Sequence, residues 1–240
     1  MKNIEYIRAE EKRYHDTFYK EANLYEAGTW LAKPVQSVLQ LLPYFEQRAS
    51  VKMLDLGCGV GRNSIAMAKA IQKKHGKVVC VDLLRTAIEK LKENSLQYQV
   101  EDVLEFYEQD IAMFPIPKES FDLVVAVSAL EHVESEYVLD SILASIEKGV
   151  KEDGYVCLVI NTEMTEEAHF FEQVLPPLLE VNLTTKAMIQ KLDSIFSDWK
   201  KEKVLTKKLE YPIMRGEAKV LMKTTAITYV VKKEGFSRGE

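Results

Sequence analysis

The chain has 240 residues, with 32 basic and 37 acidic side chains, so its formal net charge at pH 7 is −5. Charged residues make up 29% of the chain and hydrophobic residues 47%, which is ordinary for a globular protein and argues against a disordered chain or a coiled coil. The acidic balance gives no broad electrostatic reason to bind nucleic acid or an anionic membrane. The length suits one large domain.

The N-terminus and the cysteines both predict a cytoplasmic protein. Ile4 and Ile7 are interleaved with charged residues, so the apolar core of a signal peptide is missing. No stretch approaches the roughly 20 apolar residues that span a bilayer. Cys58, Cys80 and Cys157 lie far apart and show no C-x-x-C spacing. We therefore expect reduced thiols, no metal site and no membrane partner.

The first part of the chain is predicted to be helical. Residues 1–25 carry a rough helical stripe of apolar and aromatic side chains, and Pro34 opens a second amphipathic helix over residues 35–42. We expect the first helix to form a lid.

Short apolar runs then alternate with segments of helical periodicity. The runs are typical of strands, and they lie at 51–56, 78–82, about 106–110, 121–127 and 155–160. Helices are predicted between them, at about 65–76, 84–91 and 139–150. Because the strands are apolar throughout, the sheet should be parallel and covered on both faces. The predicted fold class is α/β, a doubly wound, mainly parallel sheet with its ligand at the carboxyl ends of the strands.

The C-terminal part follows a different pattern. Thr184 or Thr185 is expected to cap a helix, and two β-rich segments at 203–213 and 219–232 predict an antiparallel hairpin at the sheet edge. Residues 163–183 fit no sheet element and are interpreted as an insertion that covers the site. The predicted division of a single domain, 1–240, is a lid (1–32), a cofactor-binding core (33–162), a substrate-cap insertion (163–183) and a helix with a hairpin (184–240).

The loop after the first strand is the most informative segment. It reads DLGCGVGRN from Asp55 to Asn63, with a G-x-G-x-G spacing in place of the G-x-G-x-x-G of dinucleotide sites. Glycines there let a ligand lie against the backbone. An acid such as Asp55 would repel a pyrophosphate, whereas it suits a ligand that carries a positive charge. Arg62, in the same loop, is expected to start a helix in solvent.

Two further acids follow the next two strands. Asp82 ends the second strand, where a carboxylate can accept both hydroxyls of a ribose, or can cap the following helix. Asp110 follows the third strand and can accept from an adenine amine, with Ile111 near the ring; the alternative is a solvated turn. Together, the acids at the ends of three successive strands describe S-adenosylmethionine better than NAD.

On these residues the chain resembles class I S-adenosylmethionine-dependent methyltransferases. The resemblance extends from about residue 33 to residue 163 and rests on these stretches: VKMLDLGCGVGRNSIAMA at 51–68, VVCVD at 78–82, EQDI at 108–111, SFDLVVAVSALEHV at 120–133 and GVKEDGYVCLVINTE at 149–163. The CGVGRN loop and the short chain are similar to bacterial small-molecule methyltransferases of the tellurite-resistance type.

The resemblance implies roles for the matched residues. It places Asp55 and Gly57 at the methionine moiety, with Cys58 and Gly59 in the same loop. Asp82 should bind the ribose, and the adenine should lie between Leu83 and Ile111, beside Asp110. Ser128 should lie near the methionine end.

The implied reaction is methyl transfer by in-line displacement to a small-molecule acceptor. Positioning supplies most of such catalysis. His132, after the fourth strand, is the candidate general base, the alternative being a structural histidine. Glu131 is interpreted as a packing or helix-start residue. Trp30 is a candidate acceptor contact, while the N-terminal tyrosines are expected to pack.

Three other functions stay open at this point. An NAD-dependent oxidoreductase shares Asp82 and the fold, but the loop spacing and Asp55 argue against it. A non-catalytic S-adenosylmethionine-binding module has the same binding motifs. A nucleic-acid methyltransferase is disfavoured, because Ser128-Ala129-Leu130-Glu131 differs from the proline-rich motif of amino-methylating enzymes and no basic stripe is present. We expect a monomer or homodimer.

Overall fold

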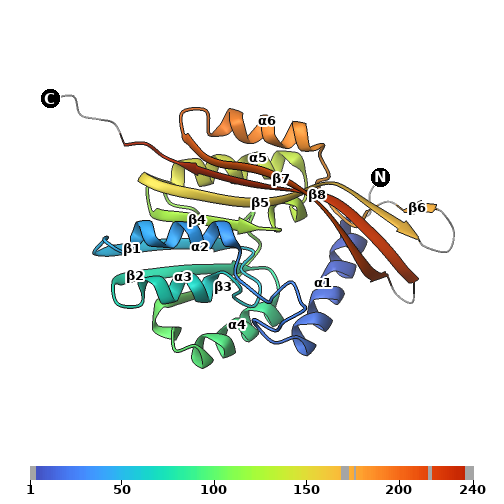
Figure 1. Cartoon of the computed structure of the whole chain (residues 1–240), viewed down its shortest axis with the longest axis horizontal. Coiled ribbons are helices and arrows are strands. Elements are labelled where there is room, and N and C mark those ends of the chain that lie inside the picture. Colours follow the sequence, from blue (N-terminus) through green and yellow to red (C-terminus); the bar gives the residue numbers. More distant parts are fainter. Residues whose placement is uncertain (1–3, 169–172, 176, 216–217, 236–240) are drawn as a thin grey trace.

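The computed structural model describes residues 4–168, 173–175, 177–215 and 218–235. Figure 1 shows one twisted sheet with helices on both faces, and a long hairpin that reaches beyond the rest of the sheet towards the N-terminal helix. The strands are β1 (Ser50–Leu56), β2 (His75–Asp82), β3 (Leu104–Glu108), β4 (Phe121–Val127), β5 (Val150–Ala168), β6 (Gln173–Leu175), β7 (Lys200–Arg215) and β8 (Ala218–Lys232). The helices are α1 (Ile4–Glu21), α2 (Gln36–Leu41), α3 (Ser64–Ile71), α4 (Arg85–Gln97), α5 (Glu136–Gly149) and α6 (Thr185–Ile195), with short 3-10 helices η1 (Leu42–Phe45), η2 (Glu101–Val103) and η3 (Leu130–His132).

The sheet confirms the predicted doubly wound α/β fold. Its strand order is β3-β2-β1-β4-β5-β8-β7, with β6 paired to β5. The first five strands of this order are parallel, and β1 pairs with both β2 and β4, so the order reverses at β1. Every residue of β4 is buried. One apolar layer packs between the sheet and α2 to α4, and the other packs beneath α5 and α6. A ligand site is therefore expected where β1 and β4 end.

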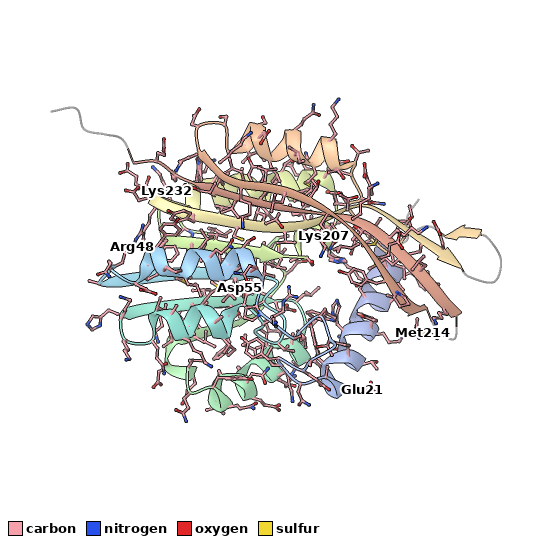
Figure 2. The ribbon with its side chains drawn as sticks, viewed as in Figure 1. Glu21, Arg48, Asp55, Lys207, Met214 and Lys232 are labelled. Atoms are coloured by element: carbon pink, nitrogen blue, oxygen red, sulfur yellow. The ribbon has the colours of Figure 1, made fainter. Side chains whose placement is uncertain are left out.

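The C-terminal hairpin is confirmed at the sheet edge. Strand β8 pairs antiparallel with β5, and β7 pairs antiparallel with β8 as the outer strand. Figure 2 shows Lys232 and Met214 at opposite ends of this hairpin. Thr184 caps α6, because its Oγ1 accepts a hydrogen bond of 3.2 Å from the backbone N–H of Ala187.

Two sequence-based boundaries were wrong. Residues 163–183 were expected to lie outside the sheet, but β5 continues to Ala168 because β8 pairs with it that far, and β6 follows; residues 169–172 and 176 lie outside the described part. The second error concerns α3, which ends at Ile71 and not near Gly76. Gly76 belongs to β2, where a Cβ would come within 2.4 Å of the carbonyl oxygen of Val51. The division of the chain into lid, core, insertion and hairpin stays a prediction.

Candidate active site

One cavity of about 1250 Å³ lies between α1, the carboxyl ends of the parallel strands and the β7–β8 hairpin. It brings together nearly all of the residues that the sequence pointed to. Those that line it are Trp30, Gly57, Cys58, Gly59, Asp82, Leu83, Asp110, Ile111, Ser128 and His132.

The glycine loop forms a backbone wall of this cavity. Gly57 has a φ of 70°, and a Cβ on it would come within 2.3 Å of the Ala129 Cβ. Its N–H donates to the Val81 carbonyl at 2.8 Å. Gly59 has a φ of 53°, and a Cβ there would lie 3.0 Å from the hydroxyl oxygen of Tyr19. Side chains are thus excluded by the loop after β4 on one side and by α1 on the other.

Asp82 is held at the cavity wall by two backbone N–H groups. Its Oδ2 accepts from Gly59 at 2.8 Å, and its Oδ1 accepts from Leu84 at 2.9 Å. Burial raises the pKa of Asp82, and these two hydrogen bonds oppose that shift. The carboxylate orders the turn before α4, but the N-cap residue of this helix is Leu84, so the alternative role of Asp82 as a helix cap is wrong. Asp82 lines the cavity, and its role as the ribose acceptor stays a prediction.

Asp55 is placed differently from the expectation. It is only 1% exposed and does not line the cavity, although its neighbours in the loop do. Its Oδ2 accepts a hydrogen bond of 2.6 Å from Ser64, the first residue of α3. Burial raises the pKa of Asp55 to about 6, against the opposing effects of the Ser64 hydrogen bond and the Arg62 charge. Asp55 is thus buried beside α3 and outside the cavity lining, and its contact with the methionine moiety stays a prediction.

The residues after β2 and β3 form the next section of the wall. Asp110 accepts from the Ala112 N–H at 2.9 Å, and its Oδ2 lies 3.7 Å from Nη2 of Arg8 in α1. Leu83 presents an apolar side chain that is 52% exposed, and Ile111 lines the same part of the cavity. The arrangement offers one hydrogen-bond acceptor flanked by apolar side chains.

The lid helix is attached to the core by Arg62, which is not the solvated residue that the sequence predicted. Its Nη1 donates to the carbonyl of Trp30 at 2.7 Å, and its guanidinium lies 5.4 Å from the centre of the Trp30 ring. The Trp30 ring in turn stacks on Phe18 of α1 at 5.1 Å. Trp30 therefore lines the cavity while it also packs the lid.

His132 pairs with an acid from the cap. Its Nδ1 lies 3.4 Å from Oε2 of Glu180, whose side chain is 2% exposed. Burial lowers the pKa of His132, but the hydrogen bond with Glu180 and the charges of Glu131, Glu11 and Glu180 outweigh it and raise the pKa to about 9. The imidazole is then protonated at neutral pH, and a protonated ring cannot accept a proton. The general-base role of His132 stays a prediction, and it requires this ion pair to open or the pH to rise.

A second histidine lines the same cavity, and sequence reasoning missed it. Burial lowers the pKa of His15 to about 4, helped by the charge of His132 and opposed by Asp16. Its ring lies 5.3 Å from that of Tyr19 and 6.2 Å from that of Trp30. The aromatic stripe of α1 was correctly expected to pack, but no sequence signal shows that a histidine within it faces the site.

The remaining wall was also missed. It consists of side chains from the extension of β5, the cap and the hairpin: Asn161, Met164, Leu178, Glu180, Leu209, Tyr211, Pro212, Ile213, Met222 and Ala226. Most of these residues are apolar. The pairing of β5, β8 and β7, together with the path of the cap, brings them to one place, so local sequence carries little information about them.

Neither a candidate metal site nor a membrane-spanning helix is found among the described residues. Within them, no cluster of three or more histidine, cysteine or acidic side chains could hold a metal ion. None of the described helices has the length and apolar character needed to cross a bilayer.

Comparison with known proteins gives a family and several relatives. A family model described as a methyltransferase domain matches residues 47–216. The 27-O-demethylrifamycin SV methyltransferase of Amycolatopsis mediterranei is 30% identical over 118 residues, which are 49% of this chain and 40% of that enzyme. The ubiquinone biosynthesis O-methyltransferase of Actinobacillus pleuropneumoniae is 28% identical over 68% of this chain and 77% of its own. A mouse tRNA N(3)-cytidine methyltransferase, METTL2, is 31% identical over 35% of this chain and 22% of its own.

Among solved structures, TehB from Haemophilus influenzae superposes with a TM-score of 0.59. The match covers 92% of this chain and 67% of that protein, at 17% sequence identity. At this identity the likeness shows the fold alone, so the tellurite-resistance subgroup stays a prediction.

Proposed function

Because the chain belongs to the methyltransferase domain family, we propose that it methylates a hydroxyl group on a small, largely apolar molecule. It is an S-adenosylmethionine-dependent methyltransferase. The acceptor and the residues that bind it are the proposal. A cytoplasmic location and a monomeric or homodimeric state stay predictions.

The cavity fits the cofactor in its chemistry. The bare backbone at Gly57 and Gly59 would hold the methionine end, and Asp82 would accept the ribose hydroxyls. Asp110 would accept the adenine amine, with Leu83 close to the ring. When bound, S-adenosylmethionine supplies a methyl group on a positively charged sulfur, so the leaving group needs no acid from the protein. The chain's own contribution is then to orient the acceptor and to exclude water.

The apolar outer wall is the observation that carries the acceptor class. A cavity of about 1250 Å³ exceeds the roughly 300–1000 Å³ of a single drug-sized site, so it has room for the cofactor and a small acceptor together. Leu209, Tyr211 and Met222 contribute apolar surface there. The relatives from Actinobacillus and Amycolatopsis are O-methyltransferases by name or act on a small molecule, and they support the same class.

His132 is the proposed proton acceptor for a hydroxyl that must lose its proton. Its ion pair with Glu180 keeps the ring protonated at neutral pH. Base catalysis would therefore appear only at alkaline pH, where it adds about 10²–10⁴-fold. At neutral pH, positioning by the cavity wall is the expected source of rate.

A transfer assay tests the proposal. The protein would be incubated with methyl-labelled S-adenosylmethionine and, separately, with catechol, a small thiol, iodide and tRNA. We expect label on catechol and none on tRNA. Methylation of tRNA in preference to every small molecule would overturn the proposed acceptor class. Binding of S-adenosylhomocysteine without transfer to any acceptor would favour the non-catalytic alternative, and binding of NAD would favour the oxidoreductase.

A further inference from the structure

Glu131 is a fully buried acid that the expected packing role does not explain. It lies in η3, immediately after β4, and its side chain is 0% exposed. Its Oε1 accepts two hydrogen bonds from Asn161 of β5, one from the backbone N–H at 3.0 Å and one from the side-chain Nδ2 at 2.7 Å. Both partners belong to one residue, so the acid fixes that residue in place.

The side-chain amide of Asn161 is held in one orientation. Its Nδ2 donates to Glu131 and also to the hydroxyl oxygen of Ser128, at 3.2 Å. An amide nitrogen has two N–H groups, so both are used. The backbone N–H of Asn161 donates to the same Oε1 atom, so Oε1 is an acceptor, and the end of the amide that lies 2.7 Å from it is assigned as nitrogen. The Oδ1 atom accepts no hydrogen bond from the described residues, and Asn161 lines the cavity.

Ser128 places this group beside the expected reaction centre. It follows the last residue of β4 with a φ of 51°, in the left-handed region, and its backbone N–H donates to the Val159 carbonyl at 2.8 Å. Such a conformation persists only where the surroundings hold it. Ser128, Asn161 and His132 all line the cavity that also holds the glycine loop and the apolar outer wall.

We propose that Asn161 binds the methyl acceptor through Oδ1, which accepts a hydrogen bond from the O–H group that will be methylated, and that Glu131 is the positioning residue that keeps Oδ1 towards the cavity. This inference rests on the proposed function and names a residue that selects an acceptor bearing a proton. The Oε2 of Glu131 has no hydrogen-bond partner among the described residues, so Oε1 alone holds Asn161 in its orientation.

The test compares two ligands of similar size on the full chain saturated with S-adenosylhomocysteine. Catechol carries O–H donors, and 1,2-difluorobenzene has the same ring and none. Calorimetry would give the ratio of their affinities in the wild type and in the variants. We expect Asn161→Leu to lower the catechol preference about tenfold, as loss of a hydrogen bond of about 1.4 kcal/mol would. Glu131→Met should do the same, because it releases the amide.

Glu131→Gln is the rescuing variant. Its carboxamide oxygen can take the place of Oε1, and its nitrogen can take the place of the unpartnered Oε2, so the catechol preference should stay within about twofold of the wild type. Asn182→Leu is the matched control, because Asn182 pairs with the backbone of Met164 at 2.9 Å through both ends of its amide and does not line the cavity. It should lower thermal stability and leave the ratio unchanged.

The outcomes separate the two proposals. If the wild type methylates catechol but the ratio of catechol to 1,2-difluorobenzene affinity is unchanged in both Asn161→Leu and Glu131→Met, the role of Asn161 is refuted while the proposed function stands. If the wild type methylates tRNA and binds neither ring compound, both fall. The Asn161 side-chain N–H signals give a readout that needs no acceptor: the N–H that donates to Glu131 should be protected from exchange in the wild type and in Glu131→Gln, and should lose this protection in Glu131→Met. Equal protection in all three would overturn the positioning role.

Discussion

Nη2 of Arg8 lies 3.7 Å from Oδ2 of Asp110, so the lid helix α1 is tied by charge to the wall where the adenine amine is expected. The same guanidinium reaches Oε1 of Glu180 in the cap, also at 3.7 Å. One lid residue thus joins the core to the cap across the cavity mouth.

Removing this link should loosen the lid without unfolding the protein. In Arg8→Ala, hydrogen exchange in α1 should accelerate severalfold, while the free energy of unfolding should fall by about 1–3 kcal/mol, because the side chain of Glu180, one of the two partners, is buried. Arg13→Ala is the control: its pair with Glu10 in the same helix lies on the exposed surface. Exchange rates that match between the two variants would show that Arg8 does not restrain the lid.

Substitution of Asp82 should mainly weaken cofactor binding, whereas substitution of Asp122 should mainly lower the free energy of unfolding. Asp82→Ala removes a cavity acceptor and should weaken S-adenosylhomocysteine binding about 10- to 150-fold, as loss of hydrogen bonds to a charged group costs about 1.5–3 kcal/mol. Asp122 is buried away from the cavity, where Arg48 and Lys151 each contact it at 2.7 Å. Asp122→Ala should lower the unfolding free energy by about 1–3 kcal/mol and leave affinity unchanged. Calorimetry and thermal melts measure both; unchanged affinity in Asp82→Ala would refute its assignment.

The pH dependence of stability should report the His132 ion pair. The pKa of His132 is raised from 6.5 to about 9, so its stabilising effect is complete below pH 6.5 and is lost as the pH rises through 9. Between these values the wild type should lose on the order of 2–3 kcal/mol relative to His132→Gln. Denaturant titrations at pH 6, 7.5 and 9.5 measure this. A parallel pH dependence in both proteins would contradict the pairing with Glu180.

The same variant tests the proposed base role of His132. If His132 removes the acceptor's proton, the turnover of catechol should rise through about pH 9 in the wild type, and in His132→Gln the rise should begin at higher pH, where only the acceptor's own ionisation remains. The affinity for S-adenosylhomocysteine should be similar in both. Equal loss of turnover at every pH would assign His132 to structure alone.

Gly57 should tolerate no side chain. In Gly57→Ala the new Cβ would collide with that of Ala129 at 2.3 Å, and the φ of 70° is unfavourable for alanine. We expect a loss of about 1–3 kcal/mol in stability together with weaker cofactor binding. The double variant Gly57→Ala, Ala129→Gly should recover part of the stability, because it removes the collision but not the backbone strain. No recovery in thermal melts would place the whole cost in the backbone.

The cofactor side of the cavity was largely predictable, and the reason is geometric. Parallel strands end at the same edge of a sheet, so Asp82, Asp110 and Ser128 had to lie near one another once the strands were identified. The burial of Asp55 was not predictable, because alternate residues of a strand point to opposite faces and the sequence does not say which face of β1 meets the cavity. The hydrogen bond that Asp55 accepts from Ser64 shows that its side chain lies on the α3 side of β1.

The acceptor side was not predictable from local patterns. Asn161 meets Glu131 only because β5 lies beside β4, and Arg8 meets Glu180 only because α1 folds back over the cap. Each contact depends on two segments far apart in the chain. The extension of β5 to Ala168 was missed for the same reason, since its pairing partner is β8.

Because of the long hairpin, the two halves of the cavity are built from different segments of the chain. Its inner residues, such as Leu209, Tyr211 and Met222, belong to an antiparallel ribbon, whereas the glycine loop and Asp82 follow strands of the parallel part of the sheet. Substitutions within the ribbon would reshape the outer wall and leave the inner cradle intact. A mutant library confined to the inward-facing positions of β7 and β8 would therefore explore new acceptors while every member kept the same methyl donor.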